Sequence, residues 1–451
     1  MTVADPLTTE RLSDIRSCLV GPAALEILRR ELASMLPDGH VLGPLTLRRS
    51  KFKPGRKLTA YYTVELGPGG GRLRDIAVIR AADGADRIPA QRDRLEAIEA
   101  EAAERGLMEP FRALEARAPA ERLRLLVWPL DPTFPHLVRL SDPTAVGRLL
   151  PIAGRPSVTA LRYRPGQRQV LRYSVPRATF FAKLHQDGDE VRAARRERAL
   201  TEWLEGGEIP VATVRPLDGI GEPGALFYPH VGGVPVLREL GRLHAAGAAL
   251  RMLHRAPHSV VEAQQPSRLA DEVRLVARAS EHIDVLLPTA ADRIRGLLAR
   301  AQDMYARLPQ EQPAVVHGDL KLDHLWWTSG RIALIDLTRC RLADPALDIG
   351  KLLADLQWWS EQTGAFEVGS AGRRFLDGYF GDAKSPRRLR AGIFEAVLLA
   401  KIAARRVPLH DPHWPARIDS LVTSAESVLA AAQRDFRRAR RTRPRPRAVL
   451  V

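Results

Sequence analysis

The distribution of apolar and polar residues divides the chain into a strand-rich first half and a helix-rich second half. Runs of β-branched and aromatic residues flank two Pro-Gly pairs, at 54–55 and 165–166, and this pattern predicts two strands joined by a tight turn in each case. From about residue 236 onward, apolar residues recur at intervals of three and four, which indicates amphipathic helices. We therefore expect an α+β protein with a small β-rich part, a linking segment and a large helical part.

Two segments of the first half resemble each other, which indicates an internal repeat. Both predict a strand, a turn and a second strand, followed by a third apolar strand and then by a charged helix. The hairpins cover 50–64 and 161–175, the third strands 75–79 and 179–184, and the helices 91–105 and 189–204. The third strand carries Lys183 in the second copy, whereas the first copy has Arg80 near that position. Chance similarity between two hairpins is the alternative to a duplication.

The length of the chain, 451 residues, exceeds the size at which one hydrophobic core keeps growing, so several domains are expected. We predict an N-terminal α+β cap over 1–150, a β-rich lobe with a hinge over 151–233, a helical lobe over 234–433 and a basic tail over 434–451. Helices of the third part are expected at 237–254, twice within 268–308, and at 349–359, 372–380, 389–404 and 418–434.

The formal net charge of +16 suggests an acidic partner, but much of it lies in the tail. Between residues 434 and 447 there are eight arginines and one acid, Asp435. Alternating prolines from 443 to 447 cannot continue a helix, so we predict a disordered tail, with an anion-binding tail as the alternative. No aromatic residues are interleaved with these arginines, so nothing indicates stacking on single-stranded nucleic acid. Nucleic-acid binding is therefore not the function we favour.

Membrane insertion and secretion are not expected. No uncharged apolar run approaches the roughly 18 residues that span a bilayer, and the first residues lack the basic and apolar stretches of a signal peptide. The two cysteines, Cys18 and Cys340, are too few for a disulfide framework or a metal cluster. These features predict a cytoplasmic protein.

The chemistry of the chain is concentrated between residues 316 and 336. Two short apolar runs each end in a carboxylate: Val316 precedes His317-Gly318-Asp319, and residues 332–335 precede Asp336. A hydroxyl-orienting Asp, a further ligand five residues later and a second Asp after the next strand are typical of phosphoryl-transfer sites. The motif Asp344-Pro345-Ala346-Leu347-Asp348 follows and strengthens this interpretation.

Residues from about 155 to 430 resemble the aminoglycoside phosphotransferase and choline kinase family, whose pattern is HGDxxxxN, a strand ending in Asp, and DPxxD. Here the pattern is present as His317 to His324, Ile335-Asp336 and Asp344 to Asp348. The resemblance implies a bilobal protein-kinase-like fold, ATP and Mg²⁺ as cofactors and a small-molecule hydroxyl as acceptor. The first 150 residues then form a cap that resembles a second, degenerate N-lobe.

The resemblance also implies roles for individual residues. Asp319 would accept a proton from the substrate hydroxyl or orient it, and Lys321 would contact the γ-phosphate, with simple solvent exposure as its alternative. Asp336 would bind the metal. His324 departs from the family's usual Asn, and imidazole is a less natural Mg²⁺ ligand than oxygen. It is either a second metal ligand or a structural histidine, with Asp323 or water completing the coordination shell.

The nucleotide would be bound by the β-rich lobe. Lys183 would pair with the α- and β-phosphates and be positioned by a helix glutamate, with Glu197 as the favoured partner and Glu190 as the alternative. The turn at 165–168 would cover the phosphates with its amides and Arg168. The adenine would lie against the hinge from Phe227 to Val231, which includes Tyr228 and His230.

The acceptor is the least determined part of the prediction. Candidate lining residues, with helix-core packing as the alternative, are Asp355, Trp358, Trp359, Glu361, Tyr379 and the run 410–414. We expect an ATP-dependent O-phosphotransferase acting on a sugar or amino-alcohol-like molecule. The alternatives are a nucleotide-binding pseudokinase with a regulatory function and an aminoglycoside or macrolide phosphotransferase. The sequence does not specify an oligomeric state.

Overall fold

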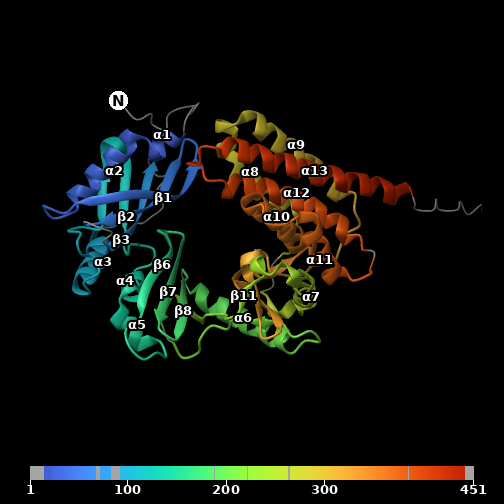
Figure 1. Cartoon of the computed structure of the whole chain (residues 1–451), viewed down its shortest axis with the longest axis horizontal. Coiled ribbons are helices and arrows are strands. Elements are labelled where there is room, and N and C mark those ends of the chain that lie inside the picture. Colours follow the sequence, from blue (N-terminus) through green and yellow to red (C-terminus); the bar gives the residue numbers. More distant parts are fainter. Residues whose placement is uncertain are drawn as a thin grey trace, which may run out of the picture. The chain divides into compact units, whose positions relative to one another are not determined.

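The structure, a computed structural model, describes residues 15–67, 72–82, 92–186, 188–220, 222–262, 265–383 and 385–441. The chain forms two compact units. The first comprises Met1–Arg195, Arg215–His230 and Pro408–Trp414, and the second comprises Arg196–Val214, Val231–Val407 and Pro415–Val451. The first unit contains the large antiparallel sheets, and the second contains most of the helices (Figure 1).

The first unit begins with a five-stranded antiparallel sheet in the order β1-β2-β3-β5-β4. Its strands are β1 (Leu42–Lys53), β2 (Lys57–Leu66), β3 (Arg72–Ala81), β4 (Glu115–Ala118) and β5 (Leu123–Val127). Its helices are α1 (Ile15–Val20), α2 (Pro22–Ser34) and α3 (Arg92–Glu104). β5 is buried at every residue, so this sheet supports a hydrophobic core of its own.

A second antiparallel sheet of the same unit has the order β10-β8-β7-β6. The strands are β6 (Ser157–Arg164), β7 (Arg168–Val175), β8 (Ala178–Leu184) and β10 (Ala225–Pro229). Two helices precede this sheet, α4 (Leu137–Ser141) and α5 (Pro143–Leu149), and α6 (Asp189–Glu205) follows β8.

The two sheets repeat one plan of connections, which confirms the predicted repeat. In each, three consecutive strands form a meander, a helix follows, and a later strand pairs with the third. Gly55 and Gly166 occupy the first turn of each copy with φ of 66° and 71°, values that favour glycine.

The register of the strands identifies the counterpart of Lys183 in the first copy. Lys183 pairs with Val170, the second residue after the start of β7, while the second residue after the start of β2 pairs with Ile79. The equivalent of Lys183 is therefore Ile79, a buried apolar residue, and Arg80 lies one position beyond it. The first copy carries no charged group at this step of the third strand.

The segment that links the two sheets is bonded to the second one. The hydroxyl of Tyr163 donates to the carbonyl of Leu130 at 2.6 Å, and that of Tyr173 donates to Leu140 at 2.9 Å. Both tyrosines are buried, and burial of a tyrosine is favourable when its hydroxyl finds an acceptor. Residues 130–140 and the second sheet thus share one core.

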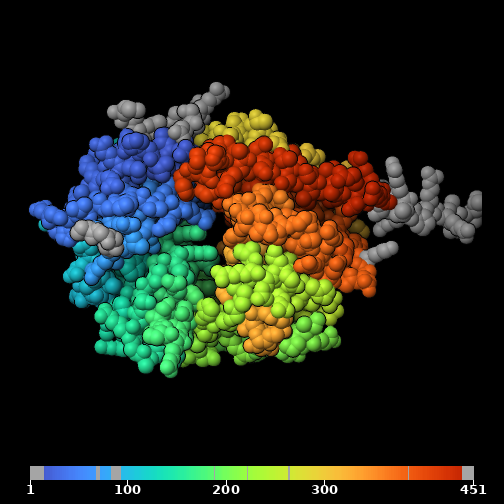
Figure 2. Space-filling view, viewed as in Figure 1, coloured from blue at the N-terminus to red at the C-terminus, as the bar shows by residue number. Residues whose placement is uncertain are grey.

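The second unit is built mainly from helices, and α13 lies along its surface (Figure 2). The helices are α7 (Leu243–Leu253), α8 (Leu269–Leu286), α9 (Pro288–Ala306), α10 (Ala346–Thr363), α11 (Val368–Phe380), α12 (Arg387–Arg406) and α13 (Trp414–Arg441). Short strands are β9 (Ala212–Thr213), β11 (Val234–Pro235), β12 (Ala314–Val316), β13 (Leu325–Thr328), β14 (Arg331–Leu334) and β15 (Arg341–Ala343). Short 3-10 helices elsewhere in the chain include Leu322–His324 and Leu337–Arg339.

Close contact between α10 and α12 depends on a glycine. A Cβ at Gly350 would lie 2.6 Å from the backbone nitrogen of Glu395 and 2.7 Å from the carbonyl oxygen of Ala391. Such distances are shorter than van der Waals contact, so any side chain here would force the two helices apart. Gly350 therefore sets the distance between α10 and α12.

The expected division into a strand-rich first part and a helix-rich second part is confirmed. The final helix reaches Arg441, beyond the predicted end at 434, and residues 442–451 of the predicted tail lie outside the described residues. None of the helices in the described ranges is long and apolar enough to cross a bilayer.

Candidate active site

The predicted reaction loop follows a short buried strand in the second unit. β12 pairs with β15 and ends at Val316, so that His317, Gly318 and Asp319 form the turn that leaves the sheet. Gly318 has a φ of 75°, and a Cβ there would approach the carbonyl oxygen of Arg339 to 2.7 Å. Only glycine meets both conditions without strain.

The backbone of this turn is held by the carboxylate of Asp348. Its two oxygens accept the amides of His317 at 2.6 Å and Gly318 at 2.9 Å, and His254 Nε2 lies 3.2 Å away. Burial opposes ionisation, but the hydrogen bond from His254 and the backbone amides outweigh it and lower the pKa of Asp348. Asp348 therefore organises the loop as an anion.

Asp319 lies between two lysines. Lys321 Nζ is 2.8 Å from one carboxylate oxygen and Lys351 Nζ is 2.9 Å from the other. Burial would raise the pKa of Asp319, but the ammonium groups of Lys351 and then Lys321 outweigh it and hold this pKa well below its usual range. The carboxylate is consequently ionised at neutral pH.

His324 and Asp336 lie together next to this loop. Their closest side-chain atoms, Nε2 and an Oδ, are 3.6 Å apart, and the ring of His324 stacks on that of His317 with centroids 5.3 Å apart. Burial, reinforced by His317 and Lys321, lowers the pKa of His324 well below its usual value, so its imidazole is neutral at pH 7. Asp336 has a φ of 64° and accepts the Thr338 hydroxyl at 3.0 Å.

The side chain of His317 holds the backbone of the loop. Its Nε2 lies 3.0 Å from the carbonyl of Ile335, which requires a proton on Nε2 because a carbonyl can only accept. Nδ1 then accepts the amide of Asp319 at 3.4 Å. The ring therefore connects the Asp319 loop to the strand that leads to Asp336.

Several residues suggested for the acceptor pocket have other partners. Asp355 is buried, accepts the amide of Leu322 at 2.8 Å and pairs with Arg406 at 2.5 Å. Tyr379 is also buried, and its hydroxyl lies 2.7 Å from His254 Nδ1. Asp355 thus anchors the loop, and Tyr379 belongs to the core, so the prediction that they line an acceptor pocket is wrong.

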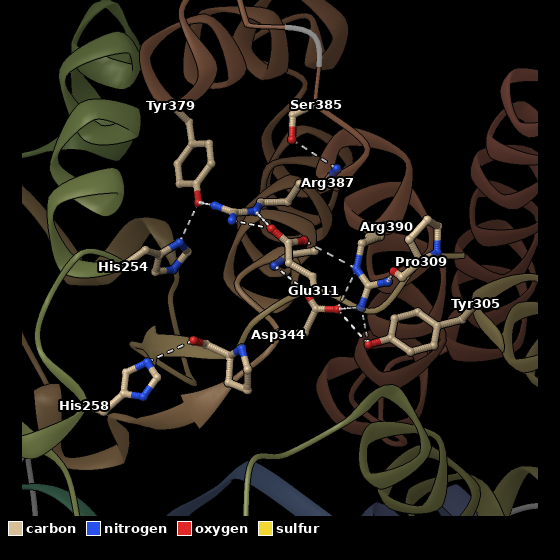
Figure 3. A network of polar contacts seen from close by, with 12 residues as sticks. His254, His258, Tyr305, Pro309, Glu311, Asp344, Tyr379, Ser385, Arg387 and Arg390 are labelled. Carbon is tan, nitrogen blue, oxygen red and sulfur yellow. Dashed lines mark hydrogen bonds and ion pairs between the residues drawn. The ribbon is translucent and has the colours of Figure 1, made fainter. Parts of the chain in front are cut away.

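A network of ion pairs continues from the loop into the helices (Figure 3). The Tyr379 hydroxyl bonds both His254 and Arg387, and Arg387 pairs with Glu311. Arg390 also bonds Glu311, at 3.5 Å, and pairs with Asp344. Its members are buried or half-buried, so solvent screens their interactions weakly.

The candidate nucleotide residues lie mainly in the first unit. Lys183 on β8 places its ammonium 4.7 Å from the centre of the Tyr228 ring on β10, and the His230 ring is 6.1 Å from that of Phe181. Arg168 begins β7 and pairs with Arg164 across the turn. Glu197 is buried on the part of α6 that belongs to the second unit.

The turn at 165–168 is bonded to Asp131, an interaction that sequence reasoning did not foresee. The amide of Gly166 donates to both Asp131 oxygens, at 3.1 and 3.2 Å, and Gln169 Nε2 donates at 2.6 Å. Complete burial raises the pKa of Asp131 to about 6 even though these donors favour its anion. The Gly166 amide, expected to contact phosphates, therefore already has an anionic acceptor.

The metal prediction depends on two side chains. Among the described residues no group of three or more His, Cys, Asp or Glu side chains could hold a metal ion, but a nucleotide-bound metal takes most of its ligands from phosphates and water. The 3.6 Å separation of His324 Nε2 and Asp336 is compatible with two ligands of one ion. The neutral imidazole and the carboxylate thus fit the implied metal.

Lys351 and Asp131 are the functional residues that the sequence analysis missed. The chain has only eight lysines, and Lys351 follows Asp348 by three positions, so the two fall on the same helix face. Lysine scarcity together with this spacing was a usable signal. Asp131 offered none, because its contact with Gly166 joins segments 35 residues apart.

An ionised aspartate between two ammonium groups, on a loop that follows a short strand and beside a His–Asp pair, defines a phosphoryl-transfer enzyme of the protein-kinase-like class. The model of the phosphotransferase enzyme family matches residues 164–391, and the chain belongs to this family. The expected family and kinase-like fold are thereby confirmed.

Several solved structures are similar to the chain. A choline/ethanolamine kinase family protein from Mesorhizobium loti is 17% identical over 63% of this chain and 94% of its own, with a TM-score of 0.45. An aminoglycoside 2'-phosphotransferase in complex with GDP is 15% identical over 66% and 99%, with a TM-score of 0.44. An aminoglycoside phosphotransferase from Streptomyces rimosus is 24% identical over 54% and 91%, with a TM-score of 0.37. A search of the curated proteins found no match.

Proposed function

We propose that the protein is an ATP- and Mg²⁺-dependent kinase that phosphorylates a hydroxyl of a small molecule, of a sugar or amino-alcohol-like kind. The observation that carries this proposal is the environment of Asp319. Its carboxylate has a lysine 2.8 Å away on one side and another 2.9 Å away on the other, on a loop fixed by Asp348. A site of this kind can bind both a hydroxyl and an anionic phosphoryl group.

Asp319 acts mainly by orientation. Its strongly lowered pKa makes it a weak base but a permanent hydrogen-bond acceptor, which aligns the acceptor hydroxyl with the phosphorus atom. Because phosphoryl transfer has a loose transition state, the hydroxyl needs little deprotonation before the bond to phosphorus forms. The hydroxyl proton passes to the carboxylate late in the reaction, as the new oxygen–phosphorus bond forms and the bond to the leaving phosphate breaks.

The two lysines supply positive charge for the transferred group. In the structure both ammonium groups form ion pairs with Asp319, so both positive charges lie at the candidate reaction site. When a hydroxyl takes up one carboxylate lone pair, an ammonium group can turn toward the developing charge on the phosphoryl oxygens. We assign this role to Lys321 and a positioning role to Lys351.

His324 and Asp336 would hold the metal, which supplies neutralisation of phosphate charge when it is bound. The low pKa of His324 keeps a lone pair available on the ring. In the first unit we assign nucleotide binding to Lys183, Arg168, Tyr228 and His230, and we propose Glu197 as the residue that positions the lysine.

The experiment that tests this function is Mg²⁺-dependent ATP consumption with pooled sugars, amino alcohols, aminoglycosides and macrolides. We expect turnover with one pool and its loss in Asp319→Ala. Asp319→Asn, which keeps the size of the side chain, should also lose most activity because an amide accepts fewer hydrogen bonds. Turnover that survives both substitutions would overturn the assignment.

A nucleotide-binding regulatory protein without turnover is the second candidate. The observation that favours it is His324, an imidazole where the family pattern places an amide oxygen. Calorimetric titration with ATP and Mg²⁺ separates the two candidates, since metal-dependent binding with no product in any pool supports the regulatory function, and product formation excludes it.

A further inference from the structure

The second unit contains a cavity that the proposed reaction does not use. Its volume is about 950 Å³, and its walls come from the residues that follow α9, the start and first half of α12 with the two residues before it, and the last part of α13. A volume of this size is typical of small-molecule sites. Much of the lining is apolar and includes Pro309, Leu389, Val428, Ala431, Ala432 and Phe436.

One carboxylate of the cavity lacks a partner. Glu395, on α12, lines the cavity, and no hydrogen bond or ion pair joins its side chain to any residue within the described ranges. Burial raises its pKa to about 8, which is the response of a carboxyl group that has lost water and gained no compensating charge. Its side chain is half-buried in the cavity wall, so a ligand that fills the cavity would remove its remaining water, and an ammonium group is the complement that compensates this loss.

The other charged groups of the cavity wall do not supply that cation. Arg307 pairs with Asp303 at 2.9 Å, and the guanidinium of Arg388 lies 4.3 Å from the centre of the Phe380 ring. Asp435, from α13, adds a second carboxylate to the lining. Neither arginine forms an ion pair with Glu395 or Asp435 within the described ranges, so both acidic side chains of the wall lack a cationic partner there.

The cavity wall is held in place before any ligand arrives. Arg390 Nη1 donates to the carbonyl of Pro309 at 3.0 Å, and the backbone amide of Arg387 donates to the hydroxyl of Ser385 at 3.2 Å (Figure 3). Pro309 and Ser385 both line the cavity. Because the two arginines also bond Glu311, an ion-pair network buttresses this side of the cavity, which makes it a preformed site.

We propose that the cavity between α12 and α13 is a second ligand site, which binds a small organic cation: an amine attached to an apolar body, with the ammonium group on Glu395. The apolar body covers Leu389, Val428 and Phe436, and Asp435 adds electrostatic attraction. An ammonium group favours the ionised form of Glu395, whereas an anionic ligand would meet two acidic side chains and a neutral ligand would leave Glu395 without a charged partner. The site is separate from the Asp319 loop and does not depend on the proposed reaction.

The test compares three probes of nearly equal size on the full chain by isothermal titration calorimetry. These are 4-phenylbutylamine, 4-phenyl-1-butanol and 4-phenylbutyrate. We expect the amine to bind about tenfold or more tightly than the alcohol, in line with the strength of a charge-assisted hydrogen bond, and the butyrate not to bind. Equal affinities for amine and alcohol would overturn the proposal.

Three variants identify the site. Glu395→Gln should abolish the preference for the amine, and Ala431→Trp, which fills the cavity from α13, should abolish binding of both amine and alcohol even if Glu395→Gln fails to fold. Asp319→Ala should bind the amine as tightly as the unmodified chain. Loss of amine binding in Asp319→Ala but not in Glu395→Gln would assign the amine to the reaction site and refute the second site.

Discussion

At the scale of single residues, the decisive feature is the balance of charge around Asp319. Two protonated ammonium groups within 3 Å of one carboxylate leave the cluster with a net charge of about +1. Burial lowers the pKa of Lys321. A cationic cluster is suited to an anionic phosphoryl donor. The same lysines also determine the protonation of Asp319, so its titration should report on them.

The first prediction concerns Lys351→Ala. Removing this ammonium group leaves burial as a larger influence on Asp319, and the pKa of the carboxyl should rise toward its usual range. Because Asp319 must be ionised to accept the hydroxyl, an acid limb of kcat/KM against pH that reports on this carboxyl should appear in the variant, whereas the unmodified chain has none in the measurable range. The measurement is a pH–rate profile with the acceptor found in the pooled assay.

Lys351→Arg is the matched control for this profile. It retains the positive charge and should show no such acid limb, although the larger guanidinium can lower the rate. The absence of a new acid limb in Lys351→Ala would show that Lys351 does not govern the titration of Asp319.

The second prediction concerns His324→Asn, which introduces the amide oxygen of the family pattern. Mn²⁺ accepts an imidazole ligand more readily than Mg²⁺, which strongly favours oxygen ligands. The ratio of activity with Mg²⁺ to activity with Mn²⁺ should therefore increase in the variant, by several-fold if His324 is a ligand. An unchanged ratio in His324→Asn, with an altered ratio in Asp336→Asn, would make His324 purely structural.

Contacts between residues close in the sequence could be predicted, whereas contacts between distant segments could not. The grouping of Asp319, His324 and Asp336 was foreseeable, because these residues flank two short strands that pair with their neighbours. The contact between Lys351 and Asp319 was not, since it requires the packing of α10 against the loop. Spacing alone could not place Asp355 correctly either, because its partner, the Leu322 amide, lies in a distant segment.

At the scale of elements, one face of α10 carries the support of the reaction loop. Asp348, Lys351 and Asp355 are three and four positions apart, so they fall on one side of the helix. They contact, respectively, the amides of His317 and Gly318, the carboxylate of Asp319, and the amide of Leu322. The position of α10 consequently determines the geometry of the whole loop.

Gly350→Ala tests this dependence. The added Cβ would meet α12 backbone atoms at 2.6–2.7 Å, so α10 must shift, and we expect a loss of about 1–3 kcal/mol of stability together with reduced kcat. Denaturant unfolding and steady-state kinetics measure the two effects. Gly241→Ala is the control, because a Cβ at Gly241 meets nothing within 4 Å. Equal behaviour of the two variants would show that α10 tolerates displacement.

The bond between Asp131 and the turn at Gly166 yields another prediction at this scale. Asp131→Ala removes the acceptor of the Gly166 amide and the Gln169 side chain, so hydrogen exchange of the peptide that contains Gly166 should become faster, by roughly an order of magnitude for each ~1.4 kcal/mol lost. Asp142→Ala is the control, since Asp142 caps α5 in the same unit. Unchanged exchange in Asp131→Ala would show that the turn is held by other contacts.

The elements themselves were largely predictable. The Pro-Gly pairs located both hairpins, and periodic apolar residues located the helices. The register of the third strands could not be predicted from the sequence. The structure shows that Ile79, rather than Arg80, is equivalent to Lys183. The last helix extends to Arg441 because arginine is a good helix former and the first helix-breaking proline of this segment comes only at 444.

At the scale of the whole molecule, the first 150 residues share a folding unit with the second sheet. Met1–Arg195 falls within one compact unit, and the linking segment supplies acceptors for Tyr163, Tyr173 and Gly166. Tyr173 is fully buried, and the pKa of its phenol is raised by that burial. The repeated sheet is thus structural support for the sheet that carries Lys183.

A chain that begins at residue 151 should therefore fail to form a stable protein, although it retains the whole segment matched by the family model. Removal of residues 1–150 would leave the Tyr163 and Tyr173 hydroxyls without their acceptors and would expose apolar surface of the second sheet. This costs several kcal/mol, against a typical free energy of unfolding of about 5–15 kcal/mol. Circular dichroism, thermal unfolding and gel filtration compare it with the full chain, and a chain ending at Arg441 serves as the truncation control that should fold. Cooperative unfolding of the 151–451 chain at the temperature of the full chain would show instead that the first 150 residues are an independent domain.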